Sequence, residues 1–368
     1  MIPKYKKNTI AYLENDVEPA PMNLLCLVGD INQDGYEDIV ISGRNGKLVW
    51  YENQKNEGKW VQHLIDEVNG LEAGGTLVDI TGNGYPDLVI GSDWRNDELY
   101  WWENPYPLDK PWRKRIIIKT GFSKFHDQII GDVTGDGKIS LIFWNQGAKR
   151  LYRVEIPDDP TVYPWPNVEV VANDIEGEGL AIADIDGDKI NEIIGGTYWF
   201  KYTGNKDCPW KTYQYAKNYV APRIRVEDIN SDGVMEIVIS EGDALIFGKN
   251  EGGKLSYFSS PKDKENLWIE NKIDENLLDP HSLEIADFCG NGRLDIIVGE
   301  IGSEKEGRKP RLILYENDGR AKFTKHILAE GISFHEAKIC DFTKTGKFSI
   351  VNKPLHGLEK WEVQIWHP

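Results

Sequence analysis

Three of the seven histidines in this sequence, together with one glutamate, recur at a single position of an internal repeat. The position lies six residues before an aspartate that begins each acidic loop of the repeat. In chain order, the residues at this position are Leu24, Ala73, His126, Glu178, Pro222, His281 and His335. A neutral imidazole can bind a transition metal, and histidine also transfers protons near neutral pH. A lone buried histidine is usually a hydrogen-bonded core residue, but four polar residues at one repeated position predict a functional site.

The repeat that carries these residues predicts the fold. Its leading aspartate recurs at intervals of 44 to 59 residues, with an apolar strand before each acidic loop and another after it. The leading aspartates are Asp30, Asp79, Asp132, Asp184, Asp228, Asp287 and Asp341. A strand-rich period of about 50 residues is typical of a β-propeller with one repeat per blade. We therefore predict an all-β protein that is one seven-bladed β-propeller of four-stranded blades, a single domain over residues 1–368.

The N-terminus is expected to close the ring. Residues 5–15 resemble the strands that precede the second and third blades, which form the outer strand of the blade before. The N-terminal strand should therefore complete the last blade beside residues 363–366 and remove two free sheet edges.

Symmetry of the ring should bring the repeated polar residues together. Equivalent positions on successive inner strands lie at one height around the axis, so His126, Glu178, His281 and His335 are expected to converge at the channel mouth. Two arrangements remain open: all four bind one divalent metal ion, or fewer bind it while His281 or His335 acts as a base. The charged residues that follow in the same strands are expected to form a supporting ion network. They are Asp127, Arg223, Arg225, Glu284, Glu336 and Lys338.

Loops between the second and third strands of each blade should overhang the same face. They supply aromatic, acidic and basic side chains of the kinds that line sugar-binding clefts. The candidate substrate-binding residues are Arg44, Trp94, Arg95, Trp144, Glu300 and Lys353. Tyr198 is a further candidate, for a catalytic role.

The acidic loops themselves have the oxygen pattern of a Ca²⁺ site. Oxygens at the first, third, fifth and ninth positions can wrap the ion, and glycine permits the sharp turn. Three loops are complete: Asp30, Asn32, Asp34 and Asp38; Asp184, Asp186, Asp188 and Glu192; Asp228, Asn230, Asp232 and Glu236. We predict structural Ca²⁺ in at least one of them. The alternative is that the same side chains cap the turn by accepting hydrogen bonds from backbone N–H groups.

The composition of the chain limits the classes of partner and the location that we expect. The net charge is −17, which disfavours a nucleic-acid partner because no basic patch is available to meet phosphates. No stretch approaches the roughly 18 apolar residues of a membrane span. No signal peptide is visible, so a cytoplasmic location is the default, and secretion is expected if such a peptide has been removed. We expect a monomer.

The loops and the strands after them resemble the FG-GAP/VCBS repeat. The residues that carry the resemblance are Asp38-Ile-Val-Ile, Asp87-Leu-Val-Ile-Gly and Asp295-Ile-Ile-Val-Gly. The repeat implies a propeller but little about function. It occurs in integrin heads, lectin-like proteins, polysaccharide lyases and sugar dehydratases of the aldos-2-ulose dehydratase type. His281-Ser-Leu-Glu, His335-Glu-Ala-Lys and Lys353-Pro354 are similar to bacterial single-propeller proteins grouped with carbohydrate breakdown.

The resemblance implies a carbon–oxygen lyase or dehydratase acting on a uronate- or keto-sugar within an oligo- or polysaccharide. Such an elimination needs a base for the proton next to the carboxylate or ketone and a cation to hold the enolate-like charge. His126, His281 or His335 can be the base, and Arg223 or a divalent metal can hold the charge. Two alternatives stay open: a non-catalytic propeller that binds glycans or proteins, and a histidine-dependent glycosidase on the same scaffold.

Overall fold

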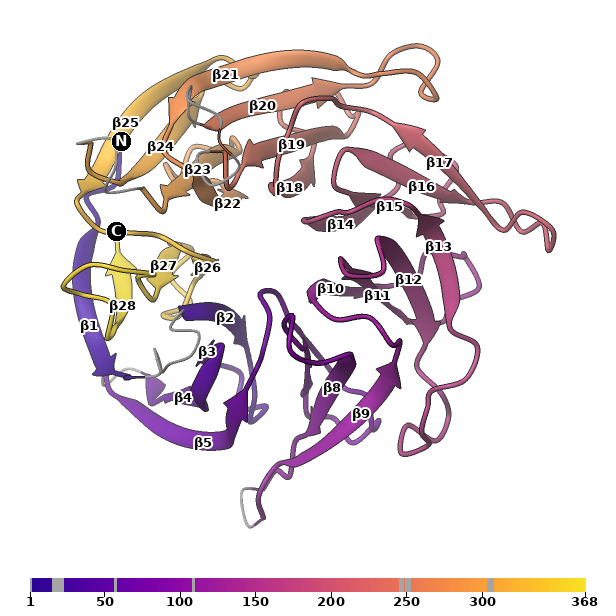
Figure 1. Ribbon diagram of the computed structural model, residues 1–368. Helices are drawn as coiled ribbons and strands as arrows, with labels where there is room; N and C mark the ends of the chain where they lie inside the picture. Colours follow the sequence, from indigo (N-terminus) through magenta and orange to yellow (C-terminus); the bar gives the residue numbers. More distant parts are fainter. Residues whose placement is uncertain are drawn as a thin grey trace.

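The chain forms seven four-stranded antiparallel sheets, which stand in a ring around a central axis (Figure 1). The computed structural model describes residues 2–14, 23–55, 58–107, 110–244, 248, 253–302 and 308–368. These ranges contain strands and turns but no α-helix. They hold no helix with the length and apolar character that a membrane crossing requires. The predicted all-β, seven-bladed propeller is confirmed.

The four strands of a blade run from the channel outward. The inner strands are β2 (Asn23–Gly29), β6 (Thr76–Val78), β10 (Phe125–Gly131), β14 (Leu180–Ala183), β18 (Pro222–Glu227), β22 (Pro280–Ala286) and β26 (Lys338–Cys340). The second strands are β3 (Asp38–Gly43), β7 (Asp87–Gly91), β11 (Ser140–Asn145), β15 (Glu192–Gly195), β19 (Glu236–Glu241), β23 (Asp295–Glu300) and β27 (Ser349–Asn352). The third strands are β4 (Asn45–Asn53), β8 (Glu98–Glu103), β12 (Arg150–Glu155), β16 (Tyr198–Tyr202), β20 (Gly253–Ser259), β24 (Arg311–Asn317) and β28 (Glu362–His367). The outer strands are β5 (Trp60–Asn69), β9 (Arg113–Lys119), β13 (Glu169–Asn173), β17 (Trp210–Gln214), β21 (Ile269–Leu277), β25 (Phe323–Glu330) and β1 (Lys6–Tyr12).

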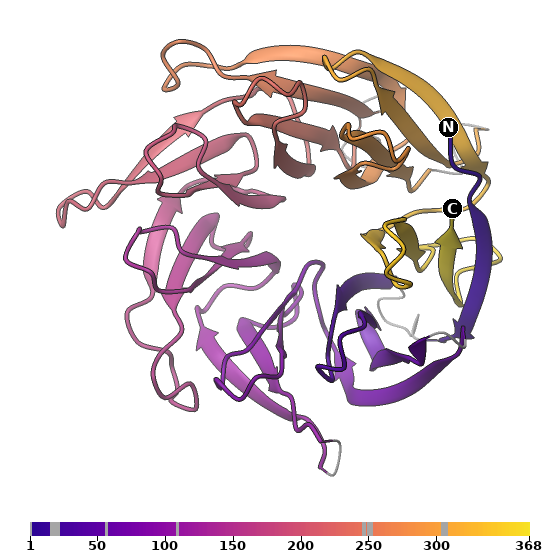
Figure 2. The same ribbon diagram turned by 180° about the vertical axis from the view of Figure 1, so that it is seen from behind.

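The N-terminal strand closes the ring, as predicted. β1 pairs antiparallel with β28, from Lys6 opposite His367 to Tyr12 opposite Glu362. The two chain ends lie near each other in both views of the ring (Figures 1 and 2). An apolar cluster also joins the first and last blades, because Cys26 and Ile39 belong to the same cluster as Cys340 and Ile365. Closure therefore pairs the edge of β28 and covers the faces of both terminal sheets.

The second strands explain the apolar runs of the repeat. Every residue of β3, β11, β19 and β23 is buried, because each blade packs against another blade on both of its faces. A strand that is covered on both faces has no solvent side, so its sequence is a continuous apolar run rather than an alternating one.

A repeated asparagine at the end of the third strand links neighbouring blades. Asn104 Nδ2 donates hydrogen bonds to the carbonyl oxygens of Ile31, in the preceding blade, and Pro86, both at 3.0 Å. The equivalent inter-blade bonds join Asn53 to Phe342 and Asn317 to Ile229. In each case the acceptor is the carbonyl of the residue just after a leading aspartate. The repeated asparagine therefore holds adjacent acidic loops in register.

We predict that Asn104→Ala lowers the free energy of unfolding by about 1–3 kcal/mol, because it leaves buried carbonyl groups without a donor. Urea unfolding measures the change, and Asn205→Ala, in an exposed turn, is the control. Equal effects of the two substitutions would show that the inter-blade bonds contribute nothing measurable.

Candidate functional site

The inner strands begin with irregular backbone next to the repeated polar position. The pairing of β10 with β11 shifts register between His126 and Gln128, and Asp127 between them has a φ of 46°. Glu336, which follows His335, has a φ of 55°. A left-handed conformation costs a non-glycine residue about 1–3 kcal/mol and persists where its surroundings enforce it. A bulge changes the directions of the side chains around it. The strained residues Asp127 and Glu336 therefore lie directly after His126 and His335 and help to orient them.

The four repeated polar residues form one continuous buried cluster. His126 Nε2 lies 3.8 Å from Glu178 Oε2, and the same oxygen accepts a hydrogen bond from Arg223 Nη1 at 3.2 Å. Arg223 Nη2 donates to His281 Nε2 at 2.6 Å. The His281 and His335 rings stack with centroids 4.3 Å apart. All five side chains are buried, so the structure brings together the residues that the repeat aligned, with Arg223 as their link.

Three carboxylates balance the positive charges of this cluster. Asp127 Oδ2 lies 2.8 Å from His126 Nδ1, and Glu336 Oε1 accepts a hydrogen bond from Arg223 Nε at 3.0 Å. Glu178 is the third. Buried charges are tolerated only when they are paired and hydrogen-bonded, and each of these groups has such a partner.

The cluster separates its two end histidines into different charge states. Burial opposes the charged form of His126, but the carboxylates of Glu178 and Asp127 outweigh it and raise its pKa to about 9. Burial and the neighbouring His281 hold the pKa of His335 well below its usual value. Burial alone would raise the pKa of Glu178, but His126 and Arg223 lower it to about 2. Near neutral pH, His126 is therefore an imidazolium and His335 a neutral imidazole.

Donor atoms for a metal ion gather at one end of the cluster. Ligand atoms of His281, His335 and Glu336 lie within 4.8 Å of one another. His335 Nδ1 is buried and has no hydrogen-bond partner. The other two residues of the predicted metal set are held by different groups: Glu178 Oε1 accepts from Gln146 Nε2 at 2.9 Å, and His126 pairs with Asp127.

The charged residues farther along the inner strands pair with one another. Arg225 Nη2 donates to Glu284 Oε1 at 2.6 Å, and Lys338 Nζ lies 3.8 Å from the same oxygen. Lys338 Nζ also lies 3.5 Å from Glu336 Oε2. These pairs supply the supporting ion network that the alternating charges predicted.

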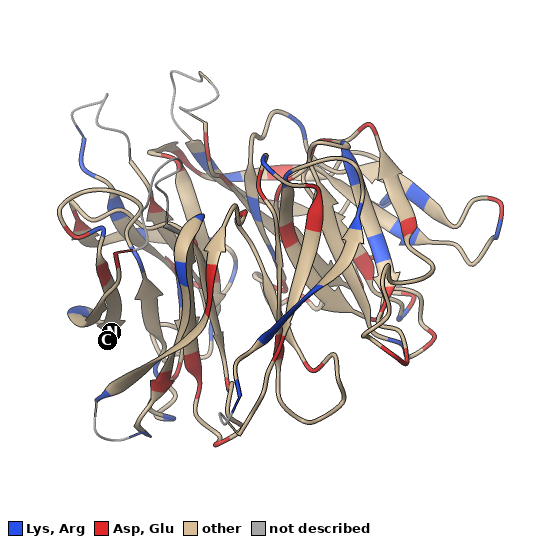
Figure 3. Cartoon of the chain, turned by 60° about the horizontal axis from the view of Figure 1, so that its bottom comes forward, with Lys and Arg blue, Asp and Glu red and all other residues tan. Residues whose placement is uncertain are grey.

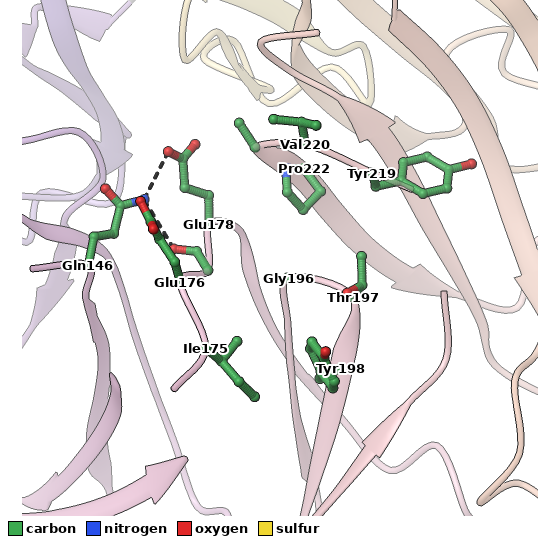
Figure 4. Close-up of a pocket in the computed structure, with 12 residues that line it drawn as sticks. Gln146, Ile175, Glu176, Glu178, Gly196, Thr197, Tyr198, Tyr219, Val220 and Pro222 are labelled. Atoms are coloured by element: carbon green, nitrogen blue, oxygen red, sulfur yellow. Dashed lines mark hydrogen bonds between the residues drawn. The ribbon is translucent and has the colours of Figure 1, made fainter. Parts of the chain in front are cut away.

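A cavity of ≈250 Å³ adjoins the cluster at Glu178 (Figure 4). Gln146, Thr197, Tyr198 and Pro222 also line it. Figure 4 shows Glu178 bonded to Gln146 on one side of the cavity and Thr197 and Tyr198 on the other. Tyr198, the predicted catalytic tyrosine, thus shares a cavity with Glu178 but is not part of the bonded chain of residues.

The rim residues of the first two blades group around one exposed ring. Trp94 is 52% exposed, and the guanidinium carbons of Arg44 and Arg95 lie 4.5 and 5.5 Å from its ring centroid. Arg44 Nη2 also pairs with Glu72 Oε1 at 2.8 Å. Arg95 Nη2 pairs with Asp93 Oδ2 at 2.6 Å. Three of the predicted substrate-binding residues therefore lie together, with Trp94 exposed and both guanidinium groups paired with carboxylates.

The other three predicted substrate-binding residues do not face a cleft. Trp144 is fully buried and packs against the backbone of the next blade, where its Nε1 donates to the Gly179 carbonyl at 3.2 Å. Glu300 is fully buried and bound by Arg311 Nη2 at 2.6 Å. Lys353 is buried, and its ammonium donates to the Lys360 carbonyl at 2.6 Å. Packing and internal pairing thus occupy these three side chains, and their contact with a substrate stays a prediction.

Two site residues were not singled out from the sequence. Gln146 holds Glu178, and Asp243 Oδ1 lies 3.5 Å from His281 Nε2. Gln146 follows directly after its second strand, at the position that Arg44 occupies in its blade, and Asp243 lies one residue farther along, after Gly242. Because antiparallel pairing puts the end of each second strand beside the start of the inner strand, this second repeated position predicts Gln146 as a neighbour of the site but not Asp243.

The acidic loops cap themselves with their own carboxylates. Asp30 accepts hydrogen bonds from the backbone N–H groups of Asp34 and Gly35 at 3.0 and 2.8 Å, and Asp38 accepts one from Ile31 at 3.0 Å. Figure 3 shows acidic and basic residues interspersed on strands and loops. The turn-capping bonds are thus present, and Ca²⁺ stays a prediction.

One of the three complete loops contains a cation of its own. The Lys201 ammonium binds the carboxylates of Asp186 and of Asp188, the latter at 2.6 Å. A lysine in this position supplies positive charge that a bound ion would otherwise provide. In the loop that begins at Asp30, Lys55 Nζ lies farther from the carboxylate, at 3.5 Å from Asp34 Oδ2. The loop that begins at Asp184 is therefore the weakest of the three candidates for Ca²⁺.

Comparison with known proteins supports the repeat and the fold. Residues 30–90 match a family model described as the FG-GAP-like repeat. Over 81 residues the chain is 33% identical to integrin alpha-8 of Homo sapiens, a match that covers 18% of this chain and only 8% of the integrin. The structure of rhamnogalacturonan lyase YesW superposes with a TM-score of 0.57 at 12% identity, over 99% of this chain and 76% of that one. BBS1N in complex with ARL6DN superposes with a TM-score of 0.57 at 9% identity, over 100% of this chain and 97% of that one.

These matches confirm the predicted resemblance in the repeat and in the propeller. Identities of 9 and 12% establish a shared fold and nothing finer. The two neighbours also differ in kind, since one is an enzyme and the other is bound to a partner protein.

We predict that protonated His126 stabilises the fold below about pH 7 and that this contribution disappears as the pH rises through about 9. The sign follows from a folded pKa of about 9 that exceeds the ordinary value of 6.5. The loss is at most about 3–4 kcal/mol, at 1.36 kcal/mol per pKa unit. Urea unfolding of the wild type and His126→Gln from pH 6 to 10 measures it, and His326→Gln, on outer strand β25, is the control. Parallel profiles for wild type and His126→Gln would contradict the assignment.

We also predict that Ca²⁺ added after chelation raises the melting temperature. An ion at a hundred times its dissociation constant adds about 2.7 kcal/mol to the free energy of unfolding. The double substitution Asp34→Ala and Asp232→Ala should abolish the rise, whereas Asp136→Ala, in a loop with an incomplete oxygen set, should leave it unchanged. A melting temperature that does not respond to Ca²⁺ would mean that the loops only cap their turns.

Proposed function

We propose that this protein is a carbohydrate-active carbon–oxygen lyase whose reaction takes place at the channel cluster. The observation that carries the proposal is the convergence of His126, His281 and His335 on Arg223 and Glu178 in one connected buried site, in which His335 Nδ1 has no partner. Neighbouring carboxylates raise the pKa of His126, and burial lowers that of His335. A base and an acid held in different charge states by their surroundings are the two groups that an elimination needs. The propeller it shares with a rhamnogalacturonan lyase supports the proposal at the level of fold alone.

The proposed reaction is a β-elimination on a uronate- or keto-sugar. His335 accepts the proton from the carbon next to the carboxylate or ketone. The electron pair of that C–H bond forms a carbon–carbon double bond, and the bond from the neighbouring carbon to its oxygen breaks. His126 donates a proton to the departing oxygen. Each proton and electron pair is accounted for, because the base gains one proton and the acid gives one up.

The transient negative charge must be stabilised beside the reacting carbon. Arg223 is the cation nearest to both ends of the cluster, since it contacts Glu178 and His281. A divalent metal bound nearby would supply Lewis-acid stabilisation of the same charge. The donor set fits such an ion, because two imidazoles and a carboxylate lie together and one ring nitrogen is unpartnered.

The rim gives the proposed substrate a place to extend. Trp94 offers an exposed aromatic face of the kind on which sugar rings stack. Arg44 and Arg95 flank this ring, and each is paired with a carboxylate, of Glu72 and of Asp93. We therefore propose a uronate-containing oligo- or polysaccharide as substrate and a monomer as the acting form.

The expected result with a panel of uronate-containing oligosaccharides is a rise in ultraviolet absorbance, because elimination leaves an unsaturated product that absorbs. His335→Ala and His126→Ala should each lower the rate about 10²- to 10⁴-fold, the usual contribution of acid–base catalysis. His326→Ala, which removes a histidine paired with Glu316 on an outer strand, should retain full activity. New reducing ends without absorbance would favour the glycosidase, and glycan binding without turnover would favour the binding propeller.

A further inference from the structure

The channel cluster contains one buried nitrogen that nothing satisfies. His335 is 3% exposed, and its Nδ1 has no hydrogen-bond partner. A buried polar atom without a partner is costly and requires an explanation such as a role in catalysis or a bound ion. The neighbouring backbone is also strained, since Glu336 holds a φ of 55°. Strain and an unsatisfied donor atom therefore coincide at two consecutive residues.

We propose that His281, His335 and Glu336 bind one divalent transition-metal ion of the zinc type. Their ligand atoms lie within 4.8 Å of one another, and all three side chains are buried. The stacking of the two imidazole rings, with an interplanar angle of 21°, keeps both histidines beside Glu336. The binding of this ion does not rest on the lyase proposed above. A ligated Nδ1 cannot also accept a proton, so the ion-bound protein and the protein in which His335 is a free base are alternative states of the same nitrogen.

The donor set selects the class of ion. Ca²⁺ takes six to eight oxygen ligands, whereas two imidazoles and one carboxylate suit zinc and related first-row metals. Catalytic zinc sites have three protein ligands and keep a further position for water or substrate. Three ligands in a channel therefore describe a site that can also bind a substrate oxygen, unlike the closed four-ligand sites that only stabilise a fold.

The structure favours these three ligands over the set aligned by the repeat. Both carboxylate oxygens of Glu178 accept hydrogen bonds, from Gln146 and from Arg223. His126 directs Nδ1 to Asp127 and lies near Glu178 through Nε2. These two residues are therefore occupied as a charged pair, and Glu336, one residue after the repeated position, replaces them as the third ligand.

Arg223 shares its contacts with the proposed ion. Its guanidinium donates to His281 and to Glu336, so it uses electron pairs that a metal would also use. Ion binding must therefore weaken the hold of Arg223 on at least one of these groups. The same guanidinium then becomes available to a substrate carboxylate, which links metal binding to substrate recognition.

The test is a titration of the full chain, first stripped of metal, with Co²⁺ followed by visible absorption and with Zn²⁺ followed by calorimetry. One equivalent should bind to the wild type. His281→Ala, His335→Ala and Glu336→Gln should each weaken binding at least about tenfold. His126→Ala and the matched control His326→Ala should bind as the wild type does. Thermal melting of each variant checks that it is folded.

A second measurement does not depend on the variants. Electron paramagnetic resonance of Cu²⁺ bound to the wild type should show hyperfine coupling to two ring nitrogens. The inference is overturned if the stripped wild type binds no ion, if His335→Ala binds as tightly as the wild type, or if His126→Ala loses as much affinity as His335→Ala. An ion that binds as stated to a protein without lyase activity would refute the proposed function and leave this site standing.

Discussion

Closure of the ring is the constraint on which the fold and the candidate site both depend. The last sheet is completed only when β1 reaches β28, and its apolar face is covered only when it packs against the first blade. His335 and Glu336 lie just before β26, the inner strand of this closing blade. An open ring would therefore lose two protected sheet surfaces, and the blade that carries His335 and Glu336 would lose the strand that completes it. The same pairing of strands thus stabilises the fold and one of the blades that form the cluster.

Within the closed ring, Arg223 determines how the charged residues arrange themselves. Its guanidinium contacts Glu178, Glu336 and His281, which come from three different blades. Removing one partner of a buried ion pair leaves an uncompensated charge and is strongly destabilising. The cluster therefore resists rearrangement, and His126 and His281 are held on strands β10 and β22. Such preorganisation is what acid–base chemistry and ion binding both require.

The sequence predicted the features that follow from symmetry. The repeated aspartate fixed the number of blades, and residues aligned within the repeat met at the channel because equivalent strands surround one axis. It could not predict which side chains packing would bury. Trp144 was expected in a loop, but it lies within β11, a second strand that is covered on both faces. The burial of Glu300 and Lys353 was missed for a related reason, since their partners Arg311 and Lys360 lie in other parts of their blades.

The sequence did not predict Glu336 as a metal ligand, for a different reason. It stands one place after the repeated position, and alternation along an extended strand would direct it away from the side that His335 faces. The left-handed backbone at Glu336 breaks this alternation. Sequence alone gives no sign of such a conformation at a non-glycine residue, which is why the third proposed ligand emerges only from the structure.

Differences in residue size and charge among the seven blades leave a cavity near the axis of the ring. The first two blades contribute Leu24, Gly74 and Gly75 to a cavity of ≈140 Å³, where blades three and seven contribute Asp127 and Glu336. A Cβ atom on Gly74 would lie 2.5 Å from the Cα atom of Asp127, so only glycine fits beside the bulge that carries this carboxylate. Small and apolar residues on one side of the axis thus make room for charged residues on the other. A ring of seven identical blades would crowd seven charged side chains around one axis, whereas this ring concentrates them on one side and keeps the opposite side open.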